Sequence, residues 1–273
     1  MKRILLLPLI LCSLLCMAQN RVSVTPAEAM SDALSGHYAG WVKGALTTYG
    51  GCNFPDVPCA DGGQKVYYPI AYGASVQVPD GVIYLGGMNA ERSLSECTHL
   101  SATDGTSTPI ASLPKPLDNF AATYHDGMLW VAGGQSDGVP NKEVYSLPYP
   151  GNAKAWTVAA TLPDACRLQP CVAVQNTASG HALFVFGGYQ PKGDGQAAAV
   201  HTDGVYMSVA ELKKGGVAPT QWKRTALVDS PHFHKFKQIG KIAHIVSGVH
   251  FSSVRVSMNV NKHNKSPLSE MFF

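Results

Sequence analysis

Four short apolar runs in this chain end in a pair of glycines, and this recurrence limits the folds that the chain can adopt. A glycine pair after a β-rich run removes side chains where backbones crowd together and lets φ become positive. One pair is common in hairpins, whereas four at intervals of about 35–55 residues indicate a repeat. The sequence therefore predicts an all-β chain that folds as a β-propeller. The pairs are Gly50-Gly51, Gly86-Gly87, Gly133-Gly134 and Gly187-Gly188.

The third repeat shows the pattern most clearly. An inner strand over residues 120–125 leads into Asp126-Gly127, a favoured hairpin turn, and a second strand over 128–132 reaches the glycine pair. Tyr145 and Trp156 follow at successive intervals of eleven residues. In kelch-type blades a Tyr and then a Trp of the outer strands pack against the diglycine turn, and these two residues fit that pattern.

The other repeats follow the same order of strand, turn, strand and glycine pair. Their predicted turns are Lys43-Gly44, Asp80-Gly81 and Ser179-Gly180. The first repeat is short, because about 36 residues separate Gly51 from Gly87 and much of that stretch is the loop over 52–65. We expect a kelch-type propeller with four recognisable blades, of which the first lacks part of its outer edge.

The N-terminus has the pattern of a secretory signal. Lys2 and Arg3 precede an apolar stretch over residues 4–15, and a small-residue cleavage site ends at Ala18. A lipoprotein anchor at Cys16 is the alternative, but Leu15 is bulkier than such sites usually allow. The sequence predicts a signal peptide over 1–18 and an exported, periplasmic protein with no other membrane span. The net charge of +3 is too small to indicate a nucleic-acid partner.

The propeller blades are expected over residues 19–230, and the composition changes after them. Residues 231–273 hold five of the ten histidines, several lysines and no glycine pair. We interpret this segment as a degenerate or partial fifth blade, or an irregular tail. The histidine spacings are irregular and do not favour a metal site.

Five cysteines remain after removal of the signal: Cys52, Cys59, Cys97, Cys166 and Cys171. Export permits disulfides, and two of the spacings, 52 to 59 and 166 to 171, would close small loops. Buried free thiols are the alternative. No Cys or His spacing is typical of a zinc site.

The loop after the first glycine pair resembles a known family. Residues 50–58 and 61–68, supported by 71–75, 86–89, 117–121 and 187–195, resemble the N-acetylneuraminate epimerases, or sialic acid mutarotases, in their cyclically permuted form. The resemblance covers residues 35 to 225. It implies a six-bladed kelch propeller of greater length, so this chain looks like a truncated member.

The resemblance implies a mutarotase acting on a small sugar acid without metal or nucleotide cofactor. One group removes the proton of the anomeric hydroxyl while another protonates the ring oxygen, and the roles reverse on closure. Arginine suits the sugar carboxylate, and amides suit its hydroxyl and N-acetyl groups.

Loops at the centre of a propeller would supply these groups. The catalytic candidates are Glu91, Asp118 and Asp194. For the sugar carboxylate we expect Arg167 first and Arg92 second. The other binding candidates are Asn53, Asn89, Asn119, Gln135 and Gln169. Each arginine could instead be a solvated loop residue, and Asp118 beside Asn119 could be a turn cap.

Two other hypotheses stay open. The first is a non-catalytic kelch module that binds glycan or protein, because fold does not fix function. The second is an inactive, truncated family member. Missing blades would leave a β edge exposed and allow self-association through it. A copper radical oxidase fits poorly, because no Tyr, His and Cys set suggests one.

Overall fold

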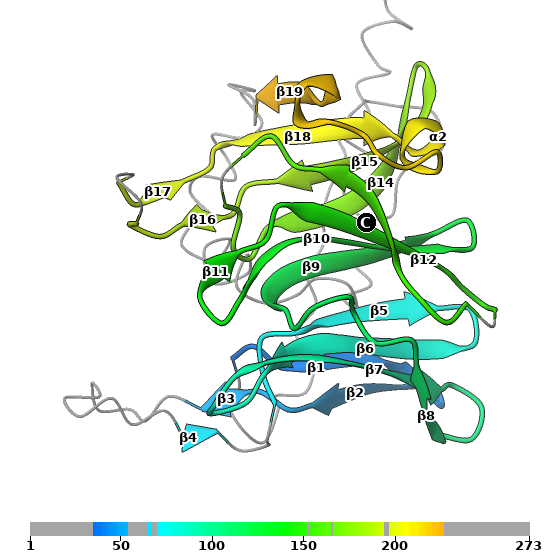
Figure 1. Cartoon of the computed structure of the whole chain (residues 1–273). Helices are drawn as coiled ribbons and strands as arrows, with labels where there is room; N and C mark the ends of the chain where they lie inside the picture. The colour runs from blue at the N-terminus through cyan, green and yellow to red at the C-terminus, as the bar shows by residue number, and fades with distance from the viewer. Residues whose placement is uncertain are drawn as a thin grey trace, which may run out of the picture. The chain divides into compact units, whose positions relative to one another are not determined.

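The structure is a computed structural model that describes residues 35–53, 65–66, 70–151, 153–164, 166–193 and 197–226. All of these residues belong to the larger of two compact units, Ser31–Val254. They are β-strands for the most part, with one short α-helix and one 3-10 turn, so the predicted all-β class is confirmed (Figure 1). The signal segment, residues 231–273 and the candidate Asp194 lie outside the described residues.

Four antiparallel sheets follow one another along the chain, one for each predicted repeat, and we number them as blades one to four (Figure 1). Blade one pairs β1 (Tyr38–Val42) with β2 (Ala45–Tyr49). Blade two holds β5 (Ala74–Val78), β6 (Gly81–Met88), β7 (Ser93–Ser101) and β8 (Ser107–Ile110) in that order. The described part of blade one thus has two strands against four in blade two, as its short repeat predicted.

Blades three and four repeat the four-stranded plan. Blade three holds β9 (Asp118–His125), β10 (Met128–Ser136), β12 (Glu143–Pro148) and β13 (Thr157–Thr161), with β11 (Val139–Pro140) added to β10. Blade four holds β14 (Cys171–Thr177), β15 (Gly180–Phe186), β18 (Asp203–Ser208) and β19 (Lys223–Ala226). The smaller elements are β3 (Cys52–Asn53), β4 (Lys65–Val66), β16 (Tyr189–Gln190), β17 (Ala199–Val200), α2 (Val209–Leu212) and η1 (Pro219–Gln221).

Two of the four predicted hairpin turns are confirmed and two are shifted by one residue. Lys43-Gly44 and Asp126-Gly127 form turns in which both residues have positive φ. In blade two, however, Val78 pairs with Gly81, so the loop residues are 79 and 80. Proline at 79 fixes a negative φ and excludes the turn with two positive φ values. In blade four Gly180 likewise opens the returning strand, where it pairs with Thr177.

The hydrophobic core lies between adjacent blades. Successive residues of a strand point to opposite faces of the sheet. Leu129 and Val131 of β10 therefore pack in the cluster shared with blade two, and Trp130 and Ala132 pack in the cluster shared with blade four. Blade three, which has a neighbour on each side, therefore buries apolar side chains on both of its faces.

The glycine pairs explain how the blades approach so closely. In three junctions the second glycine donates its N–H to a carbonyl that precedes the next inner strand, at 2.8–2.9 Å. A Cβ on Gly133 would lie 2.5 Å from the Arg167 oxygen of the next blade. Tyr145 and Trp156 are buried as predicted, but the next blade supplies the atoms nearest to Gly133. The donor–acceptor pairs are Gly51–Ile70, Gly87–Leu117 and Gly134–Arg167.

A second backbone hydrogen bond recurs two residues further along each inner segment. Tyr72 donates to Gly36 at 2.8 Å, Asn119 donates to Tyr72 at 2.8 Å, and Gln169 donates to Asn119 at 2.6 Å. All four residues have positive φ, between 49° and 64°. The inner segments are therefore linked in a chain that crosses all four blades, and its members carry the side chains considered next.

Candidate functional site

Asp118 is the centre of a polar cluster where β9 begins. Its carboxylate is buried, with 1% of the residue exposed, and accepts hydrogen bonds from three side chains. Ser93 Oγ donates at 2.5 Å, Asn119 Nδ2 at 2.6 Å and Gln135 Nε2 at 3.0 Å. A buried carboxylate is tolerated when donors replace water in this way. Gln135 reaches Asp118 because β10 pairs with β9 in a register that sets the two residues opposite each other.

The cluster continues into blade four through two amides. Gln169 Nε2 donates to Asn119 Oδ1 at 2.8 Å, in parallel with the backbone bond between the same residues. Asn119, Gln135 and Gln169 are half-buried. Within the described ranges nothing donates to the Oε1 atoms of Gln135 and Gln169. These carbonyl oxygens, with the remaining amide N–H groups, can accept from and donate to a polar ligand.

Ser93 links the cluster to blade two. Its N–H donates to Asp137 Oδ1 at 2.6 Å, and its Oγ accepts from the N–H of Asp137 at 2.8 Å. Sequence reasoning missed both residues. Asp137 precedes Gly138 just after a glycine pair, so its position in a loop of the same kind as the other candidates was the available signal.

The loop before Ser93 carries three of the predicted residues. Asn89 Oδ1 accepts from the N–H groups of Glu91 and Arg92 at 2.9 and 2.8 Å, which fixes a tight turn. The side chains of Glu91 and Arg92 point to solvent, and Arg92 Nη2 lies 4.0 Å from Glu96 Oε1. An exposed ion pair of that length is weak, so Arg92 is available to another anion.

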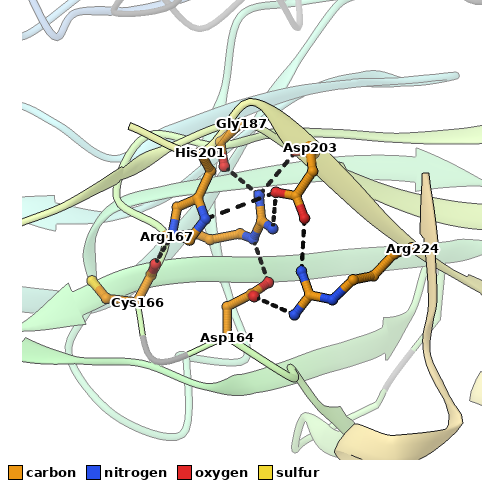
Figure 2. A network of polar contacts seen from close by, with 7 residues as sticks. All are labelled: Asp164, Cys166, Arg167, Gly187, His201, Asp203 and Arg224. Atoms are coloured by element: carbon orange, nitrogen blue, oxygen red, sulfur yellow. Dashed lines mark hydrogen bonds and ion pairs between the residues drawn. The ribbon is translucent and has the colours of Figure 1, made fainter. Parts of the chain in front are cut away.

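Arg167 lies outside this arrangement, in a separate network inside blade four (Figure 2). The residue is fully buried, and its Nε donates to Asp164 Oδ2 at 2.7 Å. Nη1 donates to the carbonyls of Gly187 and Asp203, and Nη2 donates to Asp203 Oδ1 at 2.8 Å. The guanidinium is thus occupied by the protein's own acceptors. This geometry ties the segment before β14 to β18, and it does not present Arg167 to a sugar carboxylate.

Arg224 completes this network from β19. It donates to Asp203 Oδ2 and to Asp164 Oδ1, both at 2.7 Å, so two arginines and two aspartates alternate (Figure 2). Burial raises the pKa of Asp164, but the hydrogen bonds from Arg224 and Arg167 outweigh burial and hold that pKa below its ordinary value. The pKa of Asp203 is lowered against burial in the same way. Both carboxylates are therefore anionic partners at neutral pH.

The structure also bears on the predictions for Asn53 and for the cysteines. Asn53 is placed only by its backbone in β3, opposite Lys65. Cys97, Cys166 and Cys171 are free thiols, so the Cys166–Cys171 loop is not closed by a disulfide. Burial raises the pKa of Cys97 to about 12.

Across the described ranges, no group of three or more His, Cys, Asp or Glu is arranged to hold a metal ion. No helix in that part of the chain is long and apolar enough to cross a membrane.

Comparisons with known proteins support the architecture. No family model matches the chain. No curated protein matches it. Among solved structures, the chain is similar to the one titled "Structure of YjhT", with a TM-score of 0.52 and 12% sequence identity over 77% of this chain and 69% of that chain. At this identity the likeness concerns the fold alone.

Proposed function

We propose that the chain is a mutarotase that interconverts the α and β anomers of a sugar acid of the N-acetylneuraminate type. The observation that carries the proposal is the group of three half-buried amides anchored on Asp118. Their spare donors and acceptors suit hydroxyl and acetamido groups of a sugar. Blades three and four supply these amides, and blade two supplies Ser93, which donates to Asp118.

In this proposal Asp118 is a positioning residue. It accepts from Asn119 and Gln135 and so orients both amides, and Asn119 in turn orients Gln169. Its burial keeps it away from the reacting atoms. Arg92, on the loop that ends at Ser93, binds the sugar carboxylate, because Arg167 is already occupied. Glu91 on the same loop is the exposed carboxylate that takes the proton of the anomeric hydroxyl and passes it to the ring oxygen, and it carries a proton in the opposite direction on closure. The carbon–oxygen bond of the ring breaks and reforms on the other face of the anomeric carbon.

Proton NMR of the sugar released as its α anomer by a sialidase tests this proposal. We expect the purified chain to speed the appearance of the β anomer, and we expect Glu91→Gln to abolish that gain. Asn119→Gly retains the positive φ and the backbone bond, and by removing one amide it should slow the reaction about tenfold. Asn176→Ala, at the opposite end of blade four on the exposed side of β14, is the matched control.

A glycan-binding module without catalysis is the second candidate. It is favoured by the burial of Asp118, because a carboxylate at that depth orients the amides and does not itself exchange protons with a bound sugar. Saturation-transfer NMR separates the two: binding of the sugar by a folded chain, without faster anomerisation, would establish the module and contradict the mutarotase. A folded chain that neither binds nor accelerates would contradict both.

A further inference from the structure

Two backbone hydrogen bonds recur at each junction between neighbouring blades, and we call this pair of bonds the joint. Blades one and four, at the two ends of the row, carry complementary halves of it. At blade four, the Gly188 N–H and the Gln169 carbonyl correspond to groups that bond to the next blade at the three internal junctions. At blade one, the Gly36 N–H corresponds to the donor of that same bond. None of these three groups has a hydrogen bond within the part of the chain that the structure describes.

Gly36 also has the backbone conformation that the joint uses. Its φ of 64° lies with the values of 57°, 52° and 49° at Tyr72, Asn119 and Gln169, whose N–H groups each donate to the preceding blade. The first blade is therefore shaped to donate to a carbonyl placed like that of Gln169.

The outer face of blade four carries three aromatic rings, with Lys223 Nζ 6.0 Å from the centroid of the Tyr206 ring. On β15, Leu183 and Val185 face blade three, so the alternating Phe184 and Phe186 face the other way. Phe184 stacks on Phe186 with ring centroids 5.4 Å apart, and on Tyr206 at 4.9 Å. In blade three, Trp130 lies at the same step before the glycine pair as Phe184 and is fully buried by the next blade. Phe184 and Phe186 are only half-buried.

The outer face of blade one carries apolar side chains. Tyr38 and Val42 pack against blade two, and Trp41 on the same strand points to the opposite face. Trp41 pairs across the sheet with Leu46, and these residues are 42% and 51% exposed. Trp41 and Leu46 lie side by side and form an exposed apolar patch on this face of blade one.

We propose that the chain associates head to tail, with blade one of a second copy docking on the outer face of blade four. A second copy is the favoured occupant because this chain carries both halves of the joint: the Gly36 N–H would meet the Gln169 carbonyl, and Trp41 with Leu46 would pack on Phe184. Such an interface joins two different surfaces, so each copy keeps one unused end. This association is independent of the proposed activity.

Sedimentation velocity of the purified chain over a range of concentrations tests the proposal. We expect association that grows with concentration. Trp41→Lys and Phe184→Lys should each raise the dissociation constant by about thirtyfold or more, because each places a charge in the centre of the interface. Val139→Lys, which changes a residue 67% exposed on β11, is the matched control and should associate as the parent chain does.

Mixing the two variants gives the sharper test. The Trp41→Lys chain keeps its blade-four end and the Phe184→Lys chain keeps its blade-one end, so an equimolar mixture should form a one-to-one dimer and nothing larger. A monomeric mixture of folded variants would overturn the proposal, and so would a parent chain that stays monomeric at every concentration. If circular dichroism shows Phe184→Lys unfolded, Tyr206→Lys takes its place.

Discussion

Gln169 and Asn119 are joined twice, once through the main chain at 2.6 Å and once through their side-chain amides at 2.8 Å. Both residues have positive φ, which asparagine tolerates better than most residues and glutamine less well. The backbone bond therefore fixes where the amides lie, and the amide bond supports the backbone conformation. A group held from both sides is preorganised for a ligand, because little freedom is lost on binding.

Two substitutions of Asn119 separate the contributions of its backbone conformation and of its side chain to the free energy of unfolding. Asn119→Gly keeps the left-handed conformation and loses the amide bonds, so we expect a loss of about 1 kcal/mol in the free energy of unfolding. Asn119→Val also forces a β-branched residue to a φ of 52°, and should cost about 2 kcal/mol more. Urea denaturation of both variants measures the difference, and equal stabilities would show that the joint does not require this conformation.

The Arg167 network makes a prediction about stability. Arg167→Ala leaves the largely buried Asp164 with one partner fewer and removes a fully buried guanidinium, so we expect a loss of about 3–5 kcal/mol. Arg224→Ala breaks two ion pairs with the same aspartates, but Arg224 has a side chain 54% exposed and should cost about 1 kcal/mol. Thermal unfolding compares the stabilities of the two variants. If Arg167 instead served to bind a ligand, Arg167→Ala would destabilise the chain less than Arg224→Ala.

The paired histidines predict a dependence on pH. Burial, followed by the charge of His181 at a ring distance of 4.5 Å, lowers the pKa of His125 below 6.5. As pH falls below 6.5 the unfolded chain takes up this proton first, so stability is lost down to the folded pKa. His181→Gln should raise the pKa of His125 and reduce that loss. NMR titration of the His125 ring gives the pKa directly, and an unchanged value in the variant would contradict the coupling.

The glycine pairs predict a contrast between two glycines of blade three. A Cβ on Gly134 would lie 2.5 Å from the main-chain carbonyl oxygen of Asp118, whereas a Cβ on Gly138 would meet nothing within 4 Å. Both have φ near 80°, so both alanine variants carry backbone strain of about 1 kcal/mol. Gly134→Ala should lose about 2 kcal/mol more, because the start of β9, where Asp118 and Phe120 lie, must shift away from the new methyl group. Chemical denaturation compares them; similar losses would mean that strain alone accounts for both.

The sequence predicted the repeats well because the glycine pairs and hairpins are local signals. The turn at Asp126-Gly127 needs only two adjacent residues, and it was placed correctly. The turn in blade two lies one residue earlier than the Asp80-Gly81 pair predicts, because Pro79 with its fixed negative φ is the first residue of the loop. The shared location of Asp118, Asn119, Gln135 and Gln169 also followed from the pattern, because inner strands begin where second strands end.

The role of Arg167 could not be predicted, because all of its partners except Asp164 are distant in the sequence. Scarcity and a loop position favoured a ligand contact, but Asp203 lies 36 residues away and Asp203 itself also binds Arg224. Only the pairing of β15 with β18 and of β18 with β19 brings these charges together. Ser93 was missed for the same reason, since Asp118 lies 25 residues beyond it.

The joint between blades has a consequence for how such a chain can change over time. Its two recurring bonds use main-chain groups only, and the residues that donate one of them are as different as tyrosine, asparagine and glutamine. Side chains at these positions can be replaced without disturbing how blades attach, provided that the left-handed backbone survives. A blade could accordingly be duplicated or exchanged as a unit, and the side chains of the cluster around Asn119 and Gln169 could diversify while the attachment of the blades stays constant.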